Sequence, residues 1–529
     1  MHPTQPLLAS EALVASAHPL ASLASIRVLQ DGGNPFDAAI AVNALLNVTQ
    51  PHMCGVGGDT FYLIYSSKEG YMRFLNGSGR AAKKASIEYY IAKRLKRIPH
   101  YGPLSCITVP GCVNGWEILN KKYGSKDMRE LLRFAIHYAI KGFPISRGLA
   151  SAIEQVATTV VTPGWAKVYL PHGKKPKEGE VLKQEDLGRS LTIIAEGGAD
   201  AFYSMLAEEI RKKEPEIPLS DEDFRAHTSE WSEPISLEYR GYTVYETPPN
   251  TQAVAVLIAL NVLNNFNLNE KARISAETIH LLVEATRLAY EDRANYIADP
   301  SFFDVPLEYL LSKEHADALR SRISTTSALP YADGSAEEHG DTTYFAIVDK
   351  DRNCVSCVQS LYHSFGSHIL VEGTGVVLHN RGAYFTLEKG HHNRLEPGKR
   401  PFHTLCASIT FKDGDPYIIL GSMGGDGQPQ THLQILSSII DYGLNIQEAI
   451  YWPRWLLPGT IYEKHKVLLM EERFPSRVVE RLKSLGHRVK TVEPFSSLMG
   501  HAQGIVISKD NNVLYGGADP RGDGLPIGY

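Results

Sequence analysis

This chain of 529 residues has little cysteine, no long apolar run and no excess of charge of one sign. Six cysteines are too few for a disulfide-stabilised scaffold at this length. The 54 basic and 59 acidic residues give a net charge of −5, which offers no attraction toward nucleic acid or an anionic membrane. The longest apolar run, residues 253–263, contains Asn261 and is too short to span a bilayer. We therefore expect neither a nucleic-acid nor a membrane partner.

The first residues also lack a targeting signal. The first basic residue is Arg27, so no positive segment precedes an apolar one, and Glu11 interrupts the early apolar residues. From this pattern we expect a cytoplasmic protein.

Candidate metal ligands are sparse. Cys354 and Cys357 form a C-x-x-C pattern inside a β-like run, where positions i and i+3 face opposite sides and cannot converge on a metal or easily form a disulfide. His339, His391 and His392 have no third or fourth ligand at metal spacing. We expect no metal and no other cofactor.

The coarse pattern predicts mostly helix in the first half of the chain and mostly strand after it. Asn34 is a good N-cap with Pro35 at the first helical position, and residues 275–298 carry apolar side chains at helical spacing. Residues 342–348 and 354–361 form two β-like runs with a hairpin signal between them. Strands in the middle with helices outside favour packed sheets between helical layers.

The start of the run at residue 342 suggests a chain that cuts itself. A polar stretch, residues 325–341, leads directly into Thr342 and Thr343. Cleavage before Thr342 would give it a free α-amine with a pKa of about 7.7–8.0, able to accept the proton of its own hydroxyl. One residue would then supply both nucleophile and base. The alternative is that two threonines at a strand start reflect β-propensity alone.

Short motifs over nearly the whole chain point to a family. Besides the segment around Thr342, they occupy residues 14–22, 32–39, 55–59, 109–116, 198–203, 397–401, 421–426 and 518–524. From about Ala9 to Tyr529 the chain resembles the γ-glutamyltransferase (glutathione hydrolase) family of N-terminal-nucleophile hydrolases. The resemblance implies an α+β fold, a four-layer αββα sandwich. It also implies autocatalytic cleavage of a zymogen into a large subunit, residues 1–341, and a small subunit, residues 342–529, which together form one structural unit.

A glycine-rich loop follows the strand-like residues 416–420. Glycines allow backbone N–H groups to approach a negative oxygen, and the family glycines that match Gly424 and Gly425 stabilise the oxyanion. A phosphate loop or a plain tight turn is the alternative, but no Lys-Ser/Thr pair follows and Asp426 would repel a phosphate. Thr343 and Ser360 are supporting candidates, because Ser360 stands where the family has a threonine that touches the nucleophile. The alternative is that Ser360 is simply a serine buried in a strand, with no role at the nucleophile.

The residues that bind the substrate in the family are changed here. The family arginine that binds the glutamyl α-carboxylate aligns near Ser78, and Arg80, two residues further on, is its candidate replacement. The family acid that pairs with the α-amino group aligns with Tyr384. The partner of a substrate ammonium is therefore expected to be lost, with Asp426 as the nearest alternative carboxylate.

Further replacements add cationic or aromatic groups. A family asparagine becomes Tyr362, a glutamine becomes Arg381, and a serine pair becomes His403 and Thr404. A site with Arg80, Arg381 and His403 would suit an anionic acyl group without an α-amine. Alternatively, the arginines brace loops around the site.

The leading hypothesis is a self-processing, glutathione hydrolase-like enzyme that forms an acyl-enzyme on Thr342 and passes the acyl group to water or an amino acceptor. One alternative is an amidohydrolase for a small acidic amide of the oxamate or glutaryl type. Another is a non-catalytic binding protein that keeps the fold, although such a protein needs neither Thr342 nor the glycine pair. The expected partner is a small-molecule amide, and a homo-oligomer is compatible with the sequence.

Overall fold

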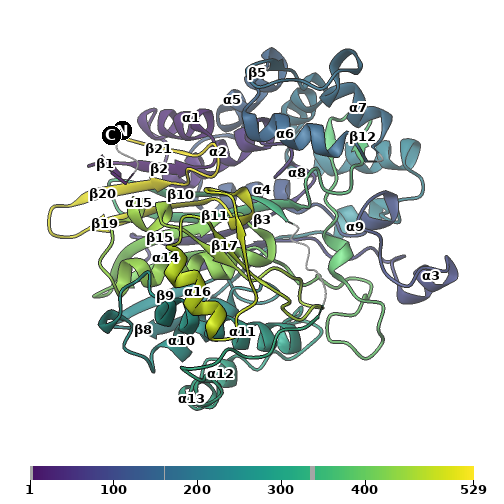
Figure 1. Ribbon diagram of the computed structural model, residues 1–529. Coiled ribbons are helices and arrows are strands. Elements are labelled where there is room, and N and C mark those ends of the chain that lie inside the picture. Colours follow the sequence, from purple (N-terminus) through teal and green to yellow (C-terminus); the bar gives the residue numbers. More distant parts are fainter. Residues whose placement is uncertain (1–3, 160, 334–339) are drawn as a thin grey trace.

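The computed structural model describes residues 4–159, 161–333 and 340–529. Two seven-stranded antiparallel sheets are stacked at its centre, and helices cover the outer face of each (Figure 1). This arrangement is the four-layer αββα sandwich expected from the resemblance. No helix of the described residues combines the length and the apolar character needed to cross a bilayer.

The strand order brings distant segments together. In the first sheet the order is β1 (Leu7–Ala9), β20 (Val513–Ala518), β19 (Ala502–Ser508), β15 (Asp415–Ser422), β14 (Ala407–Lys412), β9 (Tyr242–Glu246) and β8 (Ile235–Tyr239). In the second sheet it is β21 (Leu525–Gly528), β2 (Leu13–Ser16), β10 (Asp341–Val348), β11 (Cys354–Tyr362), β3 (Asp59–Ser66), β4 (Tyr71–Gly77) and β7 (Glu230–Ser232). The strand that begins beside Thr342 is thus central, with β2 on one edge and β11 on the other.

Short sheets lie outside these layers. They pair β5 (Phe143–Pro144) with β6 (Val181–Leu182), β12 (Leu370–Val371) with β13 (Val376–Val377), and β17 (Leu468–Glu471) with both β16 (Trp455–Leu456) and β18 (Val489–Val492).

One helical layer packs on the second sheet and the other packs on the first. The helices on the side of the second sheet are α1 (Pro19–Gln30), α2 (Pro35–Thr49), α3 (Ile87–Ala92), α4 (Cys112–Tyr123), α5 (Met128–Lys141), α6 (Arg147–Val156), α7 (Pro163–Tyr169), α8 (Glu185–Lys213) and α9 (Asp221–Ala226). Those on the side of the first sheet are α10 (Val254–Leu263), α11 (Ala276–Tyr296), α12 (Leu307–Leu310), α13 (Lys313–Ser321), α14 (Gln428–Ile440), α15 (Ile446–Tyr451) and α16 (Ser476–Ser484).

Local signals account for several of these elements. The Asn34 side chain accepts hydrogen bonds from the first-turn N–H groups of α2, where Pro35 stands at the first position, as the sequence predicts. Ser275 caps α11 in the same way. Along β11, Cys354 packs between the sheets and Cys357 packs on the helical side, so the two thiols face opposite ways. All six cysteines are buried and free.

The start of β10 departs from a regular ladder. Tyr344 and Ala346 point between the sheets while Phe345 and Ile347 point toward the helices, which is the period of two expected for a strand. The register of β10 with β11 shifts between Asp341 and Thr343. Such irregularities redirect side chains, and this one lies at the predicted cleavage point.

Candidate active site

Thr342 is buried at the beginning of β10, with 1% of its surface exposed. Its hydroxyl Oγ1 donates a hydrogen bond to Ser360 Oγ at 3.2 Å, and Gln428 Nε2 lies 3.5 Å from the same oxygen. Burial restricts water and holds the hydroxyl in one direction. A nucleophile at this position is therefore oriented before any cleavage takes place.

Ser360 joins the nucleophile to the bond that it would attack. The Ser360 hydroxyl donates to the carbonyl oxygen of Asp341 at 2.7 Å and accepts the backbone N–H of Tyr362, also at 2.7 Å. Polarising the Asp341 carbonyl makes its carbon a better target for Thr342 Oγ1. The contact proposed from sequence between Ser360 and the nucleophile is present. Thr343 turns the other way, and its hydroxyl donates to Gln50 Oε1 at 3.1 Å.

The glycine-rich loop lies against the same segment. Between β15 and α14, Gly424 and Gly425 have φ values of +133° and +50°, which side chains rarely adopt. A Cβ on Gly340 would lie 2.6 Å from Gly425 Cα, so the backbones of the loop and of the residues before the cleavage point are in close contact. The loop is thus adjacent to the bond at which cleavage is predicted. The oxyanion role of its N–H groups stays a prediction.

Arg381 is a buried cation beside the nucleophile. It is 1% exposed, and its guanidinium donates to Thr404 Oγ1 at 2.9 Å and approaches Ser360 Oγ at 3.4 Å. The rings of Tyr362 and Tyr384 lie 4.4 and 5.8 Å from its guanidinium carbon. Within the described part of the chain, no carboxylate forms an ion pair with Arg381, and its Nε has no hydrogen-bond partner. Burial lowers the pKa of Arg381, but an arginine remains charged in proteins.

Tyr384, Asp426 and Arg293 form a buried polar group in which both carboxylate oxygens of Asp426 have a protein partner. The Tyr384 hydroxyl donates to Asp426 Oδ2, and Arg293 pairs with Asp426 Oδ1 at 3.1 Å. Burial raises the pKa of Asp426, while Arg293 and the Tyr384 hydrogen bond oppose that rise. A substrate ammonium at Asp426 would therefore have to compete with an internal cation. This geometry does not favour Asp426 as a substitute for the family acid.

His403 pairs with Asp59 rather than adding positive charge. His403 Nε2 lies 3.1 Å from Asp59 Oδ2, and His379 Nδ1 lies 3.5 Å from the same oxygen. Burial, followed by the nearby Arg381, lowers the pKa of His403 to about 3, so the ring is neutral at neutral pH. The expectation that His403 contributes a cation to the site is therefore wrong, because desolvation outweighs its acidic neighbour. Asp59 was not singled out from the sequence, although it ends the motif at residues 55–59.

Arg80 forms contacts that suit a structural role. Its guanidinium pairs with Glu230 at 3.0 Å and Asp299 at 3.5 Å, and it donates to the Gly398 carbonyl at 3.2 Å. Arg80 is not among the residues that line a cavity of about 250 Å³ bordered by Asp341. These contacts favour the alternative in which Arg80 braces surrounding loops.

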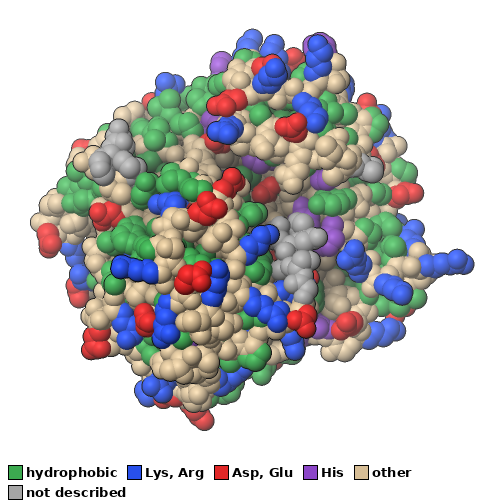
Figure 2. All heavy atoms as spheres, viewed as in Figure 1, with side chains coloured by type: hydrophobic (Ala, Val, Ile, Leu, Met, Phe, Trp, Pro, Cys, Tyr) green, Lys and Arg blue, Asp and Glu red, His purple; other side chains and the backbone are tan. Residues whose placement is uncertain are grey.

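Two cavities are lined by residues of the candidate active site. One, of about 250 Å³, is bordered by Gly340, Asp341 and Gly424. Another, of about 440 Å³, is lined in part by Tyr362 and Tyr384. The surface view shows a hollow in which histidine side chains gather (Figure 2).

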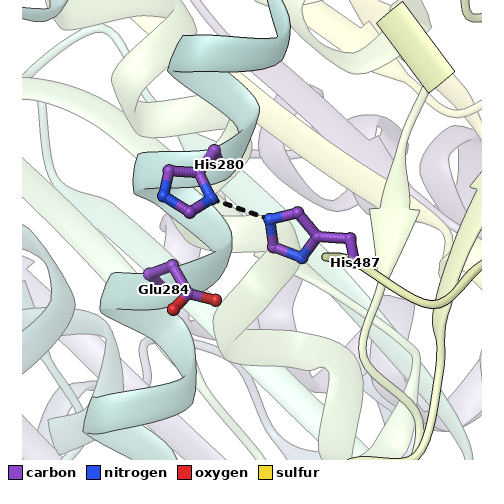
Figure 3. Close-up of side chains that lie close together, drawn as sticks. All are labelled: His280, Glu284 and His487. Atoms are coloured by element: carbon purple, nitrogen blue, oxygen red, sulfur yellow. Dashed lines mark hydrogen bonds between the residues drawn. The ribbon is translucent and has the colours of Figure 1, made fainter. Parts of the chain in front are cut away.

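In the part of the chain that is described, one group of side chains is close enough together to hold a metal ion: His280, Glu284 and His487 (Figure 3). Hydrogen bonds already use these atoms. His280 Nε2 lies 2.6 Å from the Ser324 carbonyl, its Nδ1 lies 2.8 Å from His487 Nε2, and His487 Nδ1 lies 2.8 Å from the Tyr331 hydroxyl. Glu284 accepts a hydrogen bond from the backbone N–H of Leu329, which belongs to the same segment as Ser324 and Tyr331. The cluster thus fastens the segment before the cleavage point to α11, a structural role that needs no ion. His339, rejected from the sequence as a metal ligand, lies outside the described residues; His391 and His392, rejected on the same ground, stack on each other.

The αββα fold, with a threonine at the start of a central strand and a glycine-rich loop beside it, defines an N-terminal-nucleophile hydrolase. The family model described as Gamma-glutamyltranspeptidase matches residues 21–529. The glutathione hydrolase-like YwrD proenzyme of Bacillus subtilis is 41% identical over 526 residues, 99% of each chain. The oxamate amidohydrolase proenzyme of Klebsiella pneumoniae is 35% identical over 537 residues, again 99% of each.

A crystal structure of cephalosporin acylase from Bacillus halodurans aligns with a TM-score of 0.92 and 36% identity, covering 99% of this chain and 97% of that one. The chain belongs to the γ-glutamyltranspeptidase family. It is a self-processing enzyme of the amidohydrolase and acyltransferase class. These relatives are named as enzymes and give no support to the hypothesis of a non-catalytic binding protein.

Proposed function

We propose that this enzyme hydrolyses amides of short anionic acids that carry no α-amino group. The observation that carries the proposal is Arg381: a buried guanidinium without a carboxylate partner, in contact with the serine that binds the nucleophile. Removing an ion from water costs several kcal/mol, and buried charges are normally paired. A substrate carboxylate would supply the missing partner, and arginine binds carboxylates in a bidentate geometry.

The surroundings of Arg381 support a short acyl group. Ser360 Oγ is 3.4 Å from the guanidinium and 3.2 Å from Thr342 Oγ1, so the carboxylate site and the attacked carbonyl are close neighbours. The Tyr362 and Tyr384 rings, with centroids 4.8 Å apart and both at most 2% exposed, line the 440 Å³ cavity, whose described wall residues do not include Arg381 or Ser360. An oxamate-type acid fits this arrangement better than a glutaryl-type acid, whose chain would have to displace a ring.

Self-cleavage comes first in the proposed mechanism. Thr342 Oγ1 attacks the Asp341 carbonyl carbon while Ser360 stabilises the developing charge on oxygen, and the acyl group moves from the Thr342 nitrogen to its oxygen. Water hydrolyses this ester, which divides the chain into residues 1–341 and 342–529 and frees the α-amine of Thr342. In turnover that amine takes the hydroxyl proton, Oγ1 attacks the substrate amide, and the amine product leaves with a proton. Water then releases the acid from Thr342, or an amino acceptor takes the acyl group.

The names of the relatives support two candidate acyl donors. One relative is an oxamate amidohydrolase, which fits the Arg381 geometry. Others are glutathione hydrolases, for example those of Bacillus subtilis and Escherichia coli, at 32% and 31% identity. The second candidate is therefore a γ-glutamyl amide. Tyr384 and the closed pair of Asp426 with Arg293 disfavour it, because a substrate ammonium finds no open carboxylate there.

A panel of primary amides tests the acyl group, because all of its members release ammonia. Oxamate, malonamate, succinamate and glutaramate place a carboxylate at increasing distance, oxamide lacks the charge, and glutamine adds an α-amino group to glutaramate. We expect the shortest acids to have the highest kcat/KM and glutaramate to exceed glutamine at least about tenfold, or roughly 1.4 kcal/mol. The Tyr384→Asp variant should narrow or reverse the difference in kcat/KM between glutaramate and glutamine. A wild-type enzyme that prefers glutamine by about tenfold would overturn the proposal.

The Arg381→Gln variant, which restores the family residue, tests the carboxylate partner. It should lower kcat/KM for oxamate at least about a hundredfold, or about 2.7 kcal/mol, because breaking a buried charge pair costs roughly 3–5 kcal/mol. Arg381→Lys keeps the charge and is expected to lose less. Rates are normalised to the processed fraction, measured by intact mass, so that slower self-cleavage is not mistaken for weaker catalysis. Unchanged oxamate turnover in processed Arg381→Gln enzyme would exclude Arg381 as the partner.

A further inference from the structure

The 250 Å³ cavity beside the cleavage point has walls of rings and small polar groups. Tyr101 stacks on His368 at a centroid distance of 4.2 Å with 22° between the planes, and His363 lies 5.7 Å from Tyr101. Met423 and Leu498 add apolar surface. Stacked and edge-on rings of this kind bind another flat ring well.

The position of the cavity relates it to one end of the substrate. Gly340, Asp341 and Gly424 form part of its wall in the uncut chain, so the cavity adjoins the Asp341 carbonyl, and in turnover a substrate carbonyl would take that place beside Thr342 Oγ1. Arg381 is not among its wall residues, and it approaches the nucleophile through Ser360 instead. If the acyl group of the proposed reaction points toward Arg381, the other substituent of the amide extends into this cavity.

The charge of the wall limits what that substituent can be. The described wall residues include no lysine and no arginine, and their single carboxylate belongs to Asp341. An amine portion that carries its own carboxylate, as an amino acid or dipeptide does, would lack a permanent cation there and would face Asp341. An amine with an uncharged ring needs no cation in the wall and is not repelled by Asp341.

The backbone of the loop that supplies the two histidines is held in unusual conformations. Tyr362, Phe365 and His368 have φ values of +80°, +54° and +62°, which are uncommon for residues with side chains. Strain of this kind concentrates at functional sites, where it fixes side chains that a relaxed loop would not hold. Thr159 Oγ1 lies 3.2 Å from His368 Nδ1 and further orients that ring.

From these observations we infer that the cavity is the leaving-group subsite and that it takes an uncharged amine bearing a flat ring. The inference rests on the proposed function for the direction of the acyl group. It adds that the physiological amide is substituted on nitrogen, because ammonia would leave a cavity of about 250 Å³ unused.

The test varies the amine while the acyl group stays constant. The acyl group that performs best in the primary-amide panel is joined to methylamine, benzylamine and glycine; the last two have similar basicity, so their leaving abilities match. We expect kcat/KM for the benzylamide to exceed that for the glycine conjugate at least about tenfold. A glycine conjugate that equals or exceeds the benzylamide would overturn the inference and indicate protonated histidines that bind a carboxylate. Because the acyl group is taken from the earlier panel, this outcome is independent of whether oxamate is the preferred acid.

Replacement of one ring assigns the preference to the cavity. Tyr101 is 44% exposed, so Tyr101→Ala should fold, and it should lower the benzylamide-to-methylamide ratio of kcat/KM about three- to tenfold through loss of ring contact. Tyr309→Ala removes a similarly exposed ring (49%) from α12, whose residues do not line the cavity, and should leave the ratio unchanged. A ratio that Tyr101→Ala does not alter would refute the assignment.

Discussion

Replacing Ser360 by alanine should separate folding from self-cleavage. Ser360 is 1% exposed, and its hydroxyl donates to the Asp341 carbonyl at 2.7 Å while it accepts from Thr342 Oγ1 at 3.2 Å. Losing one donor to a developing oxyanion commonly costs about 10²–10³ in rate, or about 2.7–4 kcal/mol. The Tyr362 N–H would also lose its acceptor. We therefore expect Ser360→Ala to slow cleavage at least about a hundredfold.

The assay follows the uncut chain over time. Protein is purified quickly, incubated at constant temperature and sampled into denaturant, and the fraction of intact chain is quantified by gel and intact mass. Circular dichroism and a urea midpoint verify that each variant is folded. Ser360→Thr keeps a hydroxyl and should retain most of the rate. Ser356→Ala is the matched control, because that serine is buried in the same strand but bonds to the Tyr344 hydroxyl at 2.7 Å instead of the cleavage point. A folded Ser360→Ala chain that cleaves within about threefold of wild type would refute the reasoning, since that is less than 1 kcal/mol.

Other predictions concern the same bond and the stability of the fold. Thr342→Ala should remain one chain, and wild type should yield a fragment that begins at Thr342; sequencing of any other new N-terminus would contradict the assignment. Gly340→Ala should slow cleavage at least about tenfold, or 1.4 kcal/mol, because φ is +138° there and the new Cβ would lie 2.6 Å from Gly425 Cα; normal kinetics would disprove this. Burial lowers the pKa values of His403 and His487 to about 3, so below pH 6.5 the unfolded chain binds more protons than the folded one. The free energy of unfolding should then fall by about 1.4 kcal/mol per pH unit for each histidine as the pH drops from 6.5 toward 3. Urea midpoints that stay constant from pH 6.5 to 4.5 would contradict this.

Much of the fold could be predicted from local signals and from the order of family motifs. The Asn34 cap and the alternation along β10 follow from short-range chemistry, and the structure shows both. The strand order does not follow from local pattern, because β10 pairs with β2, which lies more than 300 residues away in the chain. Only the resemblance to a family implied four layers.

The site was predicted unevenly. Thr342 was indicated by the polar stretch that leads into two threonines and Ser360 by alignment with the family, and their contact is present. The bond from Ser360 to the Asp341 carbonyl lies at a register shift in β10, which no residue pattern predicted. The charge of His403 was misjudged because its desolvation depends on the side chains that enclose it. The Arg80 pairs with Glu230 and Asp299 join segments far apart in sequence, so they too needed the fold.

The charges around the nucleophile, taken together, indicate the charge of the substrate. In the γ-glutamyl pattern an arginine faces the α-carboxylate and an acid faces the α-ammonium, so a neutral pair of protein charges matches a zwitterion. Here the arginine position holds Ser78, the acid position holds Tyr384, and Asp426 is neutralised by Arg293. What remains is Arg381, which forms no ion pair within the described residues, although the charge of Asp59, itself bonded to His403, reaches it. A buried arginine that lacks a directly bonded carboxylate is complementary to a substrate carboxylate, and a zwitterion would add an ammonium that finds no open carboxylate at Asp426. The same replacements therefore support the proposal that the site takes a simple carboxylate in place of a γ-glutamyl group.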